Sequence, residues 1–379
     1  MVYDGGDEVR EVARAAAELY LEDNALNTRA FPSLGSLQSD VLKACADLCH
    51  GPDAAGAMTA GGTESILMAV KAARERGHIE RGVTDPEMVV PASAHAAFHK
   101  AASYFGVEAV VVPVDADWRA DVDGTADALT PRTVLVVGSA PTYPQGVIDP
   151  IPELAELAMH SGASFHTDAC MGSFILPFAE QPGRDVPPWD FRVDGVTSIS
   201  SDVHKLGYAP KGASVILHRT RELRRYQTFV FDDWLGGFYA SPSMAGSRPG
   251  GPIAAAWAVM HLLGTDGYRS LTGATLDAAA RLTHGIRAIP GLAVLGDPQW
   301  HIVAFEADDP AVDVFAVGDA LAARGWYLDR QTPPDSLHAT VSAGNVPTID
   351  DLLADLANAV AEQRGRRADD RSTDYATLD

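Results

Sequence analysis

The feature that most constrains the fold is a series of short apolar segments, separated by helical stretches, between residues 55 and 219. The segments are almost continuously apolar, as strands are when both faces of a sheet are covered. Helical spacing of apolar residues occurs between several of them, for example at 63–76 and 152–160. This alternation predicts an α/β fold with a mostly parallel sheet. The predicted strands are 88–92, 109–114, 133–140, 164–169, 195–200 and 213–219.

The segments before this block predict an N-terminal arm. Residues 7–22 place apolar side chains at helical spacing, and residues 38–50 do so again. The intervening stretch, 24–35, contains Asn, Pro and Gly and is predicted to be a loop.

The segments after the block predict a second, smaller unit. A Gly/Pro-rich stretch at 246–252 precedes a helical block at 253–289. Strand-like runs at 301–307 and 340–343 flank a predicted helix near 312–324, which indicates an α+β unit. The expected bounds are 1–50 for the N-terminal arm and helices, 51–252 for the large domain, 253–365 for the small C-terminal domain and 366–379 for a polar, frayed tail.

Composition and charge exclude several classes of function. The 379 residues include 29 basic and 51 acidic side chains, a net charge of −22, which argues against nucleic-acid binding. No apolar run approaches the roughly 18–20 residues of a membrane span, and the N-terminus does not resemble a signal peptide. Three cysteines cannot form a disulfide framework, so we expect a reducing compartment, the cytoplasm.

Lysine is rare in this chain. Only five of the 29 basic residues are lysines, namely Lys43, Lys71, Lys100, Lys205 and Lys211. If the chemistry requires a primary amine, few residues can supply it. Two of the five lie close together, in the stretch SISSDVHKLGYAPKG that follows a predicted strand.

Two other stretches carry candidate binding groups. In TAGGTES, glycines precede a long helix whose first turn holds Thr63, so free N–H groups and the helix dipole can bind phosphate; a plain capped turn is the alternative. In SFHTDAC, Asp168 ends a buried strand, where ligands bind in open α/β sheets. A buried carboxylate needs a cationic partner, which can be a protonated cofactor ring or an ordinary arginine.

The remaining candidates are a lysine and a pair of histidines. Lys205 in a partly dry pocket is expected to have a lowered pKa and can form a Schiff base. His95 and His99, four apart at a helix start, can form half a metal site, but no HExxH or CxxC motif supplies further ligands, and we expect no metal. A histidine stacked on a flat cofactor ring fits His95 better. Three features at the strand ends of one sheet together indicate a pyridoxal phosphate site: the phosphate cradle, the buried Asp168 and Lys205.

Several stretches of the chain, taken in order, resemble the sphingosine-1-phosphate lyase family, a member of the group II pyridoxal phosphate-dependent decarboxylases. The resemblance runs from Tyr3 to about His338, and its two most specific motifs surround Lys205 and lie at 246–251. The stretches are TAGGTESILMAVKA, SAHAAFHKAASYFG, SAPTYPQGVIDPI, FHTDACMGSF, VTSISSDVHKLGYAPKGASVIL and ASPSMAGSRPGG.

This resemblance implies a fold, a cofactor and a reaction. The fold is aspartate-aminotransferase-like (fold type I), with a mostly parallel seven-stranded sheet and a smaller C-terminal α+β domain. The cofactor is pyridoxal 5′-phosphate, in a homodimer with active sites shared between subunits. The reaction is retro-aldol cleavage of a phosphorylated sphingoid base or related amino alcohol at C2–C3, giving a fatty aldehyde and phosphoethanolamine. Because the chain begins just before Tyr3, we expect a soluble form without the membrane anchor of eukaryotic members.

The resemblance also implies roles for individual residues. Lys205 would hold the cofactor as a Schiff base, Asp168 would pair with the ring nitrogen, and His95 and Cys170 would lie near opposite ring faces. The groups expected at the cofactor phosphate are Gly61, Gly62, Thr63, Ser200, His204 and, from the partner subunit, Gly246 and Ser247. The residues expected to face the substrate are Tyr3, Asn24, Asn27, Tyr143 and Lys211. The expected catalytic groups are Lys205, His95, Asp168, Tyr143 and Lys211, and the sequence does not rank the acid–base candidates among them.

One departure from the family keeps an alternative open. Family members generally carry a His three residues after Asn24, where this chain has Asn27, so a charge that would bind substrate phosphate is missing. An amino-acid decarboxylase would need an acid-binding group, which Arg29 or Arg248 can provide. A non-catalytic scaffold is a third hypothesis, against which the intact Lys205 and Asp168 argue.

Overall fold

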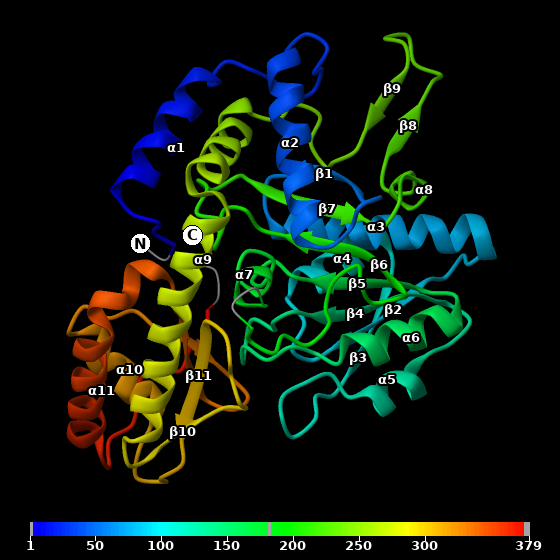
Figure 1. Cartoon of the computed structure of the whole chain (residues 1–379). Helices are drawn as coiled ribbons and strands as arrows, with labels where there is room; N and C mark the ends of the chain where they lie inside the picture. The colour runs from blue at the N-terminus through cyan, green and yellow to red at the C-terminus, as the bar shows by residue number, and fades with distance from the viewer. Residues whose placement is uncertain (1–2, 181–182, 375–379) are drawn as a thin grey trace.

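The computed structural model describes residues 3–180 and 183–374, which form a large and a small β-sheet with helices packed on both (Figure 1). The seven-stranded sheet has the order β1-β7-β6-β5-β4-β2-β3, and only β7 runs against its neighbours. This confirms the predicted fold class. Its strands are β1 (Ala55–Thr59), β2 (Glu87–Pro91), β3 (Glu108–Val112), β4 (Thr133–Ser139), β5 (Ser164–Asp168), β6 (Val196–Ser201) and β7 (Ser214–His218).

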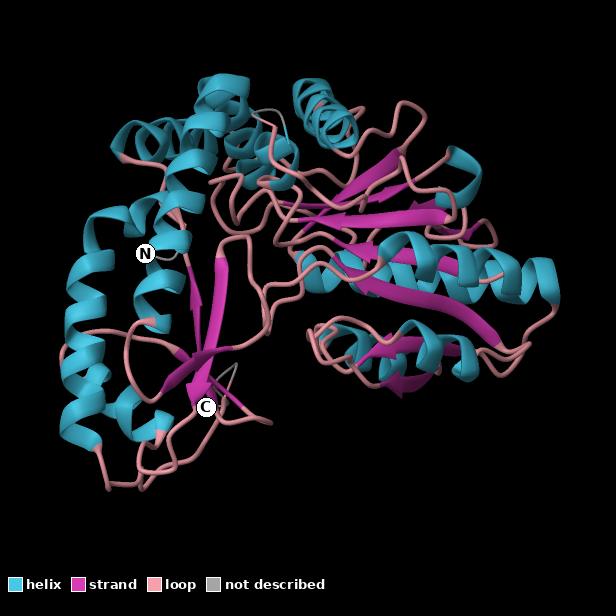
Figure 2. Ribbon diagram, turned by 60° about the horizontal axis from the view of Figure 1, so that its bottom comes forward, coloured by secondary structure: helices cyan, strands magenta, loops and turns pink. Residues whose placement is uncertain are grey.

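Strands β2 and β4 are largely apolar because each of their faces lies in a separate core. Val89 and Val136 belong to the core on one face, whereas Met88 and Leu135 belong to the core on the other. Alternate residues of a strand point to opposite faces, so both sets must be apolar. Figure 2 shows helices along the sheet. They are α3 (Gly62–Arg81), α4 (Ala97–Phe105), α5 (Val122–Ala128), α6 (Ile151–Ser161), α7 (Leu176–Glu180) and α8 (Arg221–Arg224).

The N-terminal helices pack against the long helix α9 (Gly250–Arg287). Helix α1 (Asp7–Leu19) lies near its predicted position, but α2 (Pro32–Leu48) begins six residues earlier than the predicted start at residue 38. Proline is favourable in the first turn of a helix, where its missing N–H would have no partner. The predicted loop over 24–35 is therefore shorter than expected.

The small sheet has the order β10-β11-β13-β12 and is covered by α9 and α10, against which α11 packs. The strand predicted at 340–343 instead ends at Thr340, because Ser342 and Asn345 form a capping box that starts the 3₁₀ helix η1 (Ala343–Thr348). The elements are β10 (Leu292–Val294), β11 (Ile302–Ala307), α10 (Val314–Ala322), β12 (Asp329–Gln331), β13 (Ser336–Thr340) and α11 (Ile349–Gln363).

The described part of the tail is attached to this small sheet rather than frayed. Arg371 forms ion pairs with Asp313, at 2.7 Å, and with Asp335. The Arg330 guanidinium also donates to the backbone carbonyl of Asp370 at 2.8 Å. Charge pairs therefore fix this segment, together with Ala368, which packs against the core of the small unit.

A two-stranded hairpin extends from the body of the molecule (Figure 1, upper right). It consists of β8 (Phe229–Phe231) and β9 (Tyr239–Ser241). Its large apolar side chains are exposed: Phe229, Val230, Phe231, Trp234, Leu235 and Phe238. Within the described residues, helices with the length and apolar character of a membrane span do not occur.

Candidate active site

The carboxyl ends of several strands of the large sheet meet around one cavity of about 280 Å³, which we call the Lys205 cavity. This volume is close to the lower end of the range for small-molecule sites, roughly 300–1,000 Å³. It brings together nine of the predicted site residues. The lining includes Gly61, Gly62, Thr63, His95, Tyr143, Asp168, Cys170, His204 and Lys205, together with Asp202 and Met171, which were not predicted.

Asp168 ends strand β5 and is only 8% exposed. Its Oδ1 accepts hydrogen bonds from Ser200 Oγ at 2.8 Å and from the backbone N–H of Cys170 at 3.1 Å. Burial raises the pKa of this carboxyl, but nearby His95 and Lys205 outweigh that effect and leave the pKa below its usual value. Asp168 is therefore a carboxylate at neutral pH and can pair with a protonated ring nitrogen.

Ser200 lies behind this carboxylate and is not among the residues that line the cavity, and its expected contact with a cofactor phosphate stays a prediction. Its hydroxyl donates to Asp168 and lies 3.2 Å from His166 Nε2, whose ring is fully buried. The other ring nitrogen of His166 lies 2.9 Å from Ser198 Oγ. Burial lowers the pKa of His166 to about 4, so the ring is neutral and orients Ser200 toward Asp168.

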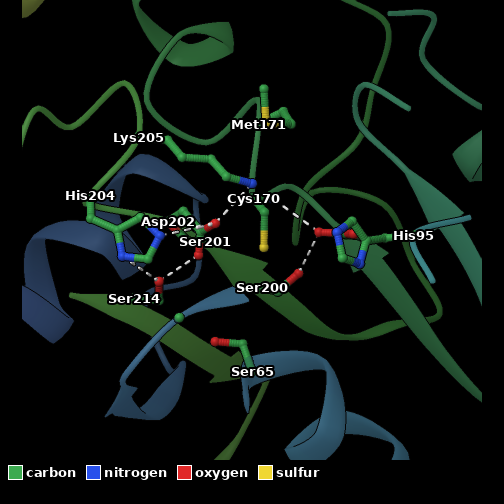
Figure 3. A network of polar contacts seen from close by, with 12 residues as sticks. Ser65, His95, Cys170, Met171, Ser200, Ser201, Asp202, His204, Lys205 and Ser214 are labelled. Carbon is green, nitrogen blue, oxygen red and sulfur yellow. Dashed lines mark hydrogen bonds and ion pairs between the residues drawn. The ribbon is translucent and has the colours of Figure 1, made fainter. Parts of the chain in front are cut away.

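Lys205 follows strand β6, and its ammonium group lies 3.0 Å from Asp202 Oδ2 (Figure 3). Burial lowers the pKa of Lys205, but Asp202 and Cys170 raise it more, and the net pKa is raised. The predicted lowering of the Lys205 pKa is therefore wrong, because the negative charge of Asp202 was not foreseen. Ser214 Oγ donates to the same Asp202 side chain at 2.5 Å.

The start of α3 has the geometry that a phosphate cradle needs, and phosphate binding there stays a prediction. Gly61 and Gly62 precede Thr63, and the N–H groups of the first helical turn lie at the positive end of the helix dipole. A Cβ added to Gly62 would lie 2.7 Å from Cys170 Sγ and 2.9 Å from Asp202 Oδ2, so only glycine fits there. Backbone N–H groups can therefore approach a ligand in the cavity closely.

Two histidines line the cavity from different loops. Nδ1 of His95 accepts a hydrogen bond from the backbone N–H of Ala97 at 3.1 Å, so a proton on the neutral ring lies at Nε2. His204 Nε2 lies 3.7 Å from Asp202 Oδ2. Burial lowers the pKa of both histidines. The His95 ring is thus neutral at pH 7 and suited to contact with a flat aromatic group.

Tyr143 connects the cavity to the small sheet. Its phenolic O–H donates to Asp329 Oδ2 on β12 at 2.8 Å. Its ring packs on His338 of β13, with centroids 4.3 Å apart, and its carbonyl oxygen lies 2.9 Å from His338 Nε2. His338 also lies 3.7 Å from Asp329, and its hydrogen bond is the leading cause that lowers the pKa of that carboxyl. Asp329 is therefore ionised and positioned to accept a proton from Tyr143.

Tyr3 and Lys211 lie together beside the cavity. The Lys211 ammonium is 4.7 Å from the centre of the Tyr3 ring and donates to the carbonyl of His204 at 3.0 Å. The Tyr3 hydroxyl lies 3.9 Å from the sulfur of Met171, a lining residue. Burial and the charge of Lys205 lower the pKa of Lys211. These two residues are placed to meet a group that enters from the surface.

The remaining predicted residues form a separate cluster. Asn24 Nδ2 donates to Ser247 Oγ at 3.0 Å, and Asn24 Oδ1 accepts from the backbone N–H of Arg248. Asn27, Gly246 and Ser247 do not line the Lys205 cavity of their own chain. The Arg248 guanidinium donates to Ser243 Oγ and to the Ala25 carbonyl, so it is engaged within its own loop. It is poorly placed to bind a substrate carboxylate.

Three residues of the site were missed by the sequence reasoning. His166 stands two positions before Asp168, and the strand period of two places both on one face, which was a usable signal. Asp202 stands three positions before Lys205, within the motif that surrounds the lysine, but no role was predicted for it. Asp329 reaches Tyr143 across 186 positions of sequence, and no local pattern indicates that contact.

The fold and the site define a class of enzyme, and comparisons with known proteins agree. The model of the pyridoxal-dependent decarboxylase conserved domain matches residues 16–308. A glutamate decarboxylase from Lactobacillus brevis, 22% identical, has the same fold, with a TM-score of 0.82 over 94% of this chain and 86% of the other. The chain is therefore a pyridoxal phosphate-dependent enzyme of this class, with the cofactor expected from the sequence.

Closer relatives narrow the class. A sphingosine-1-phosphate lyase of Arabidopsis thaliana is 44% identical over 95% of this chain and 67% of its own length. The corresponding rat protein is 43% identical over 90% of this chain, which spans 60% of that relative. The structure of a Burkholderia pseudomallei sphingosine-1-phosphate lyase is 40% identical with a TM-score of 0.92, over 96% of this chain and 85% of the other. The chain belongs to the sphingosine-1-phosphate lyase family.

Proposed function

We propose that this protein cleaves a phosphorylated sphingoid base, or a related phosphorylated amino alcohol, at the C2–C3 bond, releasing a fatty aldehyde and phosphoethanolamine. The observation that carries this proposal is the Lys205 cavity, which places an amine, a buried carboxylate and a helix N-terminus around one space. Lys211 and Tyr3 add a cation and a phenol beside it, which suits a substrate with a phosphate at one end.

The residues present fit pyridoxal phosphate. Lys205 would attach the cofactor covalently, Asp168 would pair with the ring nitrogen, and His95 would lie against the ring. Gly62 and Thr63 would hold the phosphate at the start of α3, where any side chain on Gly62 would collide with Cys170. When bound, the cofactor withdraws electrons from the bond that breaks.

Tyr143 is the group we assign to the C3 hydroxyl of the substrate. Its oxygen would take the hydroxyl proton while its own proton passes to Asp329 Oδ2, which lies 2.8 Å away and is ionised. Asp329 in turn lies 3.7 Å from His338. This arrangement distinguishes Tyr143 from Lys211, whose nitrogen already donates to a carbonyl group. Lys205, once released from the cofactor, would return a proton to C2.

A homodimer with shared active sites would complete this site. The exposed apolar side chains of the β8–β9 hairpin, among them Trp234, Leu235 and Phe238, form a surface of the kind that protein partners cover. Ser247 and Asn24 lie together on the surface and away from the cavity of their own chain. We assign them to the cavity of a second subunit, with Ser247 at its cofactor phosphate and Asn24 and Asn27 toward its substrate. The three unpaired cysteines are in keeping with a cytoplasmic location, which we also propose.

Aldehyde release from purified protein with added cofactor tests the function. Sphinganine 1-phosphate should yield a fatty aldehyde, and Lys205→Ala should abolish both the aldehyde and the visible absorbance of bound cofactor. Lys211→Ala should raise KM for phosphorylated substrates, whereas Lys43→Ala, a change on the exposed face of α2, should have no effect. Carbon dioxide release from an amino-acid panel without any aldehyde would contradict the proposal.

A further inference from the structure

Two side chains of the small sheet lie behind Tyr143, the residue assigned to the C3 hydroxyl of the substrate. Asp329 of β12 and His338 of β13 stand opposite each other in the register of that sheet, so their side chains share one face. The Tyr143 hydroxyl donates to Asp329 Oδ2 at 2.8 Å, and the same oxygen lies 3.7 Å from His338 Nδ1. The three side chains thus meet at one carboxylate oxygen, and we call them the Tyr143 relay.

The proton of the neutral His338 ring is fixed by the backbone. Its Nε2 lies 2.9 Å from the carbonyl oxygen of Tyr143, and a carbonyl can only accept, so Nε2 carries the proton. Nδ1 then holds a lone pair. This atom is buried without a hydrogen-bond partner among the described residues, because 3.7 Å is longer than a formed hydrogen bond. Nδ1 can therefore accept one further proton, on the side that faces Asp329.

The charged groups packed around His338 leave Asp329 as the partner of a positive charge on its ring. The His338 side chain is fully buried on β13. Next to the start of β11, His301 is neutral, because burial lowers its pKa to about 3. On α10, which packs on β13, Asp319 is paired with Arg330. A protonated His338 would therefore form an ion pair with Asp329 that carries no net charge.

An imidazole holds a proton more firmly than a carboxylate does. The ordinary pKa values of the two kinds of side chain differ by about 2.6, which is roughly 400-fold in proton affinity. A proton that passes from Tyr143 to Asp329 alone would therefore return readily to the phenol. Transfer onward to His338 Nδ1 holds the proton, and it converts a loose contact into a charge-assisted hydrogen bond.

We propose that His338 is a positioning residue of the reaction, which acts through Asp329 to hold the proton that leaves the C3 hydroxyl of the substrate. This inference rests on the proposed lyase function. The hydroxyl O–H bond breaks and its proton goes to the Tyr143 oxygen, while the phenol proton passes through Asp329 Oδ2 to His338 Nδ1. The electron pair of that O–H bond completes the C=O bond of the aldehyde.

The protons of the whole reaction balance. The electron pair of the C2–C3 bond stays with the amine-bearing fragment, where Lys205 supplies a proton at C2. The Tyr143 relay has meanwhile gained one proton, which must be released before the next cycle. The side chain of Asp329 is 33% exposed, whereas that of His338 is fully buried, so Asp329 gives the stored proton a route to water. Water can return a proton to Lys205.

His338→Gln tests this role. Glutamine keeps an N–H for the carbonyl of Tyr143 but has no group that takes up a proton. The rate of aldehyde formation from sphinganine 1-phosphate in a single turnover should fall at least about tenfold, with KM and the visible absorbance of bound cofactor unchanged. His160→Gln, the same change at an exposed position of α6, should alter none of these values.

The pH profile separates proton uptake from packing. In the unchanged enzyme and in His160→Gln, the single-turnover rate should fall about tenfold per pH unit at the acidic end, because a proton already on His338 Nδ1 fills the place that the reaction needs. His338→Gln should lack this decline. Cofactor absorbance, recorded at each pH, limits the comparison to the range in which the cofactor stays bound.

Three results would overturn the inference while the lyase function stands. They are an unchanged single-turnover rate in His338→Gln, an acidic decline that this variant retains, and loss of its cofactor absorbance, which would make the role of His338 structural. If the unchanged enzyme releases no aldehyde, the lyase proposal fails, and the inference fails with it because the relay has no substrate proton to carry.

Discussion

At the level of single residues, the site depends on which polar groups hold a proton. Asp168 accepts two hydrogen bonds and keeps its charge, while His166 behind it stays neutral because burial lowers its pKa to about 4. Asp329 keeps its charge through His338 and Tyr143. The two carboxylates therefore differ in function: Asp168 can pair with a cation, and Asp329 is placed to receive a proton.

The Tyr143–Asp329 contact leads to a prediction about rate. Tyr143→Phe removes the proton relay but keeps the ring that packs on His338, so kcat should fall by about 10²-fold or more, the range of general acid–base catalysis. Cofactor absorbance should be unchanged, since the phenol is not assigned to cofactor binding. Steady-state kinetics alongside Tyr104→Phe, a change at an exposed tyrosine of α4, checks this. An unchanged kcat in Tyr143→Phe would remove the phenol from the reaction.

At the level of elements, the start of α3 is limited by close packing. The helix begins at Gly62, whose missing Cβ leaves room for Cys170 and Asp202. The strand β1 that precedes it lies next to β7, so the loop between β1 and α3 faces the loop that carries Lys205. The phosphate cradle at the start of α3 and the amine of Lys205 therefore lie at one edge of the sheet, although the elements that carry them are far apart in sequence.

Gly62→Ala should therefore weaken cofactor binding. The added methyl group would lie 2.7 Å from Cys170 Sγ, and relief of that contact must displace the helix start or the sulfur. Titration with pyridoxal phosphate, followed by absorbance, should give a Kd at least about tenfold higher, equivalent to roughly 1.4 kcal/mol. Gly273→Ala, whose Cβ meets nothing within 4 Å in α9, is the control for a glycine change as such. Equal affinities in the two variants would contradict the close-packing argument.

The same elements explain how far the sequence could predict the structure. All six predicted strands of the large sheet were found, because each contains a short run of apolar residues, including the edge strand β3, which is partly exposed. Asp168 was found because it ends such a run, and Lys205 because it lies shortly after another one in a chain with few lysines. The Tyr143–Asp329 contact joins residues 186 positions apart, and the position of Ser200 behind Asp168 follows from the pairing of β5 with β6, so no local pattern in the sequence indicates either. The early start of α2 was missed because Pro32 was taken as a loop signal rather than a first-turn residue.

At the level of the whole molecule, the proposed dimer can be tested by complementation. A mixture of Lys205→Ala and Ser247→Phe subunits forms heterodimers in which one site receives both intact residues. If half of the dimers are mixed and each has one complete site, activity should recover to about a quarter of the unmutated enzyme. A mixture of Lys205→Ala and Asp168→Asn subunits is the control. Each of these changes damages the cavity that its own chain forms, so a mixed dimer has no complete site. No recovery in the first mixture would rule out sharing through Ser247.

The free energy of unfolding should decrease at acidic pH because the chain contains buried histidines. Burial lowers the pKa of His166 and His218 to about 4 and that of His301 to about 3, against 6.5 for the free side chain. Because the folded pKa is lower, the unfolded chain binds protons first, and stability present above pH 6.5 is lost as the pH falls toward 4. The loss at pH 5 is about 2 kcal/mol for each such histidine.

Urea unfolding at pH 7.5 and pH 5 measures this loss. His301→Leu should reduce the difference between the two pH values by about 2 kcal/mol, since neither ring nitrogen of His301 has a hydrogen-bond partner among the described residues. His160→Gln, at an exposed position, should leave the difference unaltered. A pH dependence that His301→Leu does not change would show that this ring is not the source.

The pairing of β1 with β7 has a consequence for biosynthesis. Ala55 of β1 lies opposite His218 of β7, so the edge of the sheet that bears the phosphate cradle has no neighbouring strand until the ribosome has delivered residue 218. Strand pairs this distant in sequence close slowly, and an unpaired edge is exposed in the meantime. The cradle at Gly62 is thus assembled late. A nascent chain that ends before residue 218 already contains Lys205 but has not yet formed the site that binds the vitamin-derived cofactor.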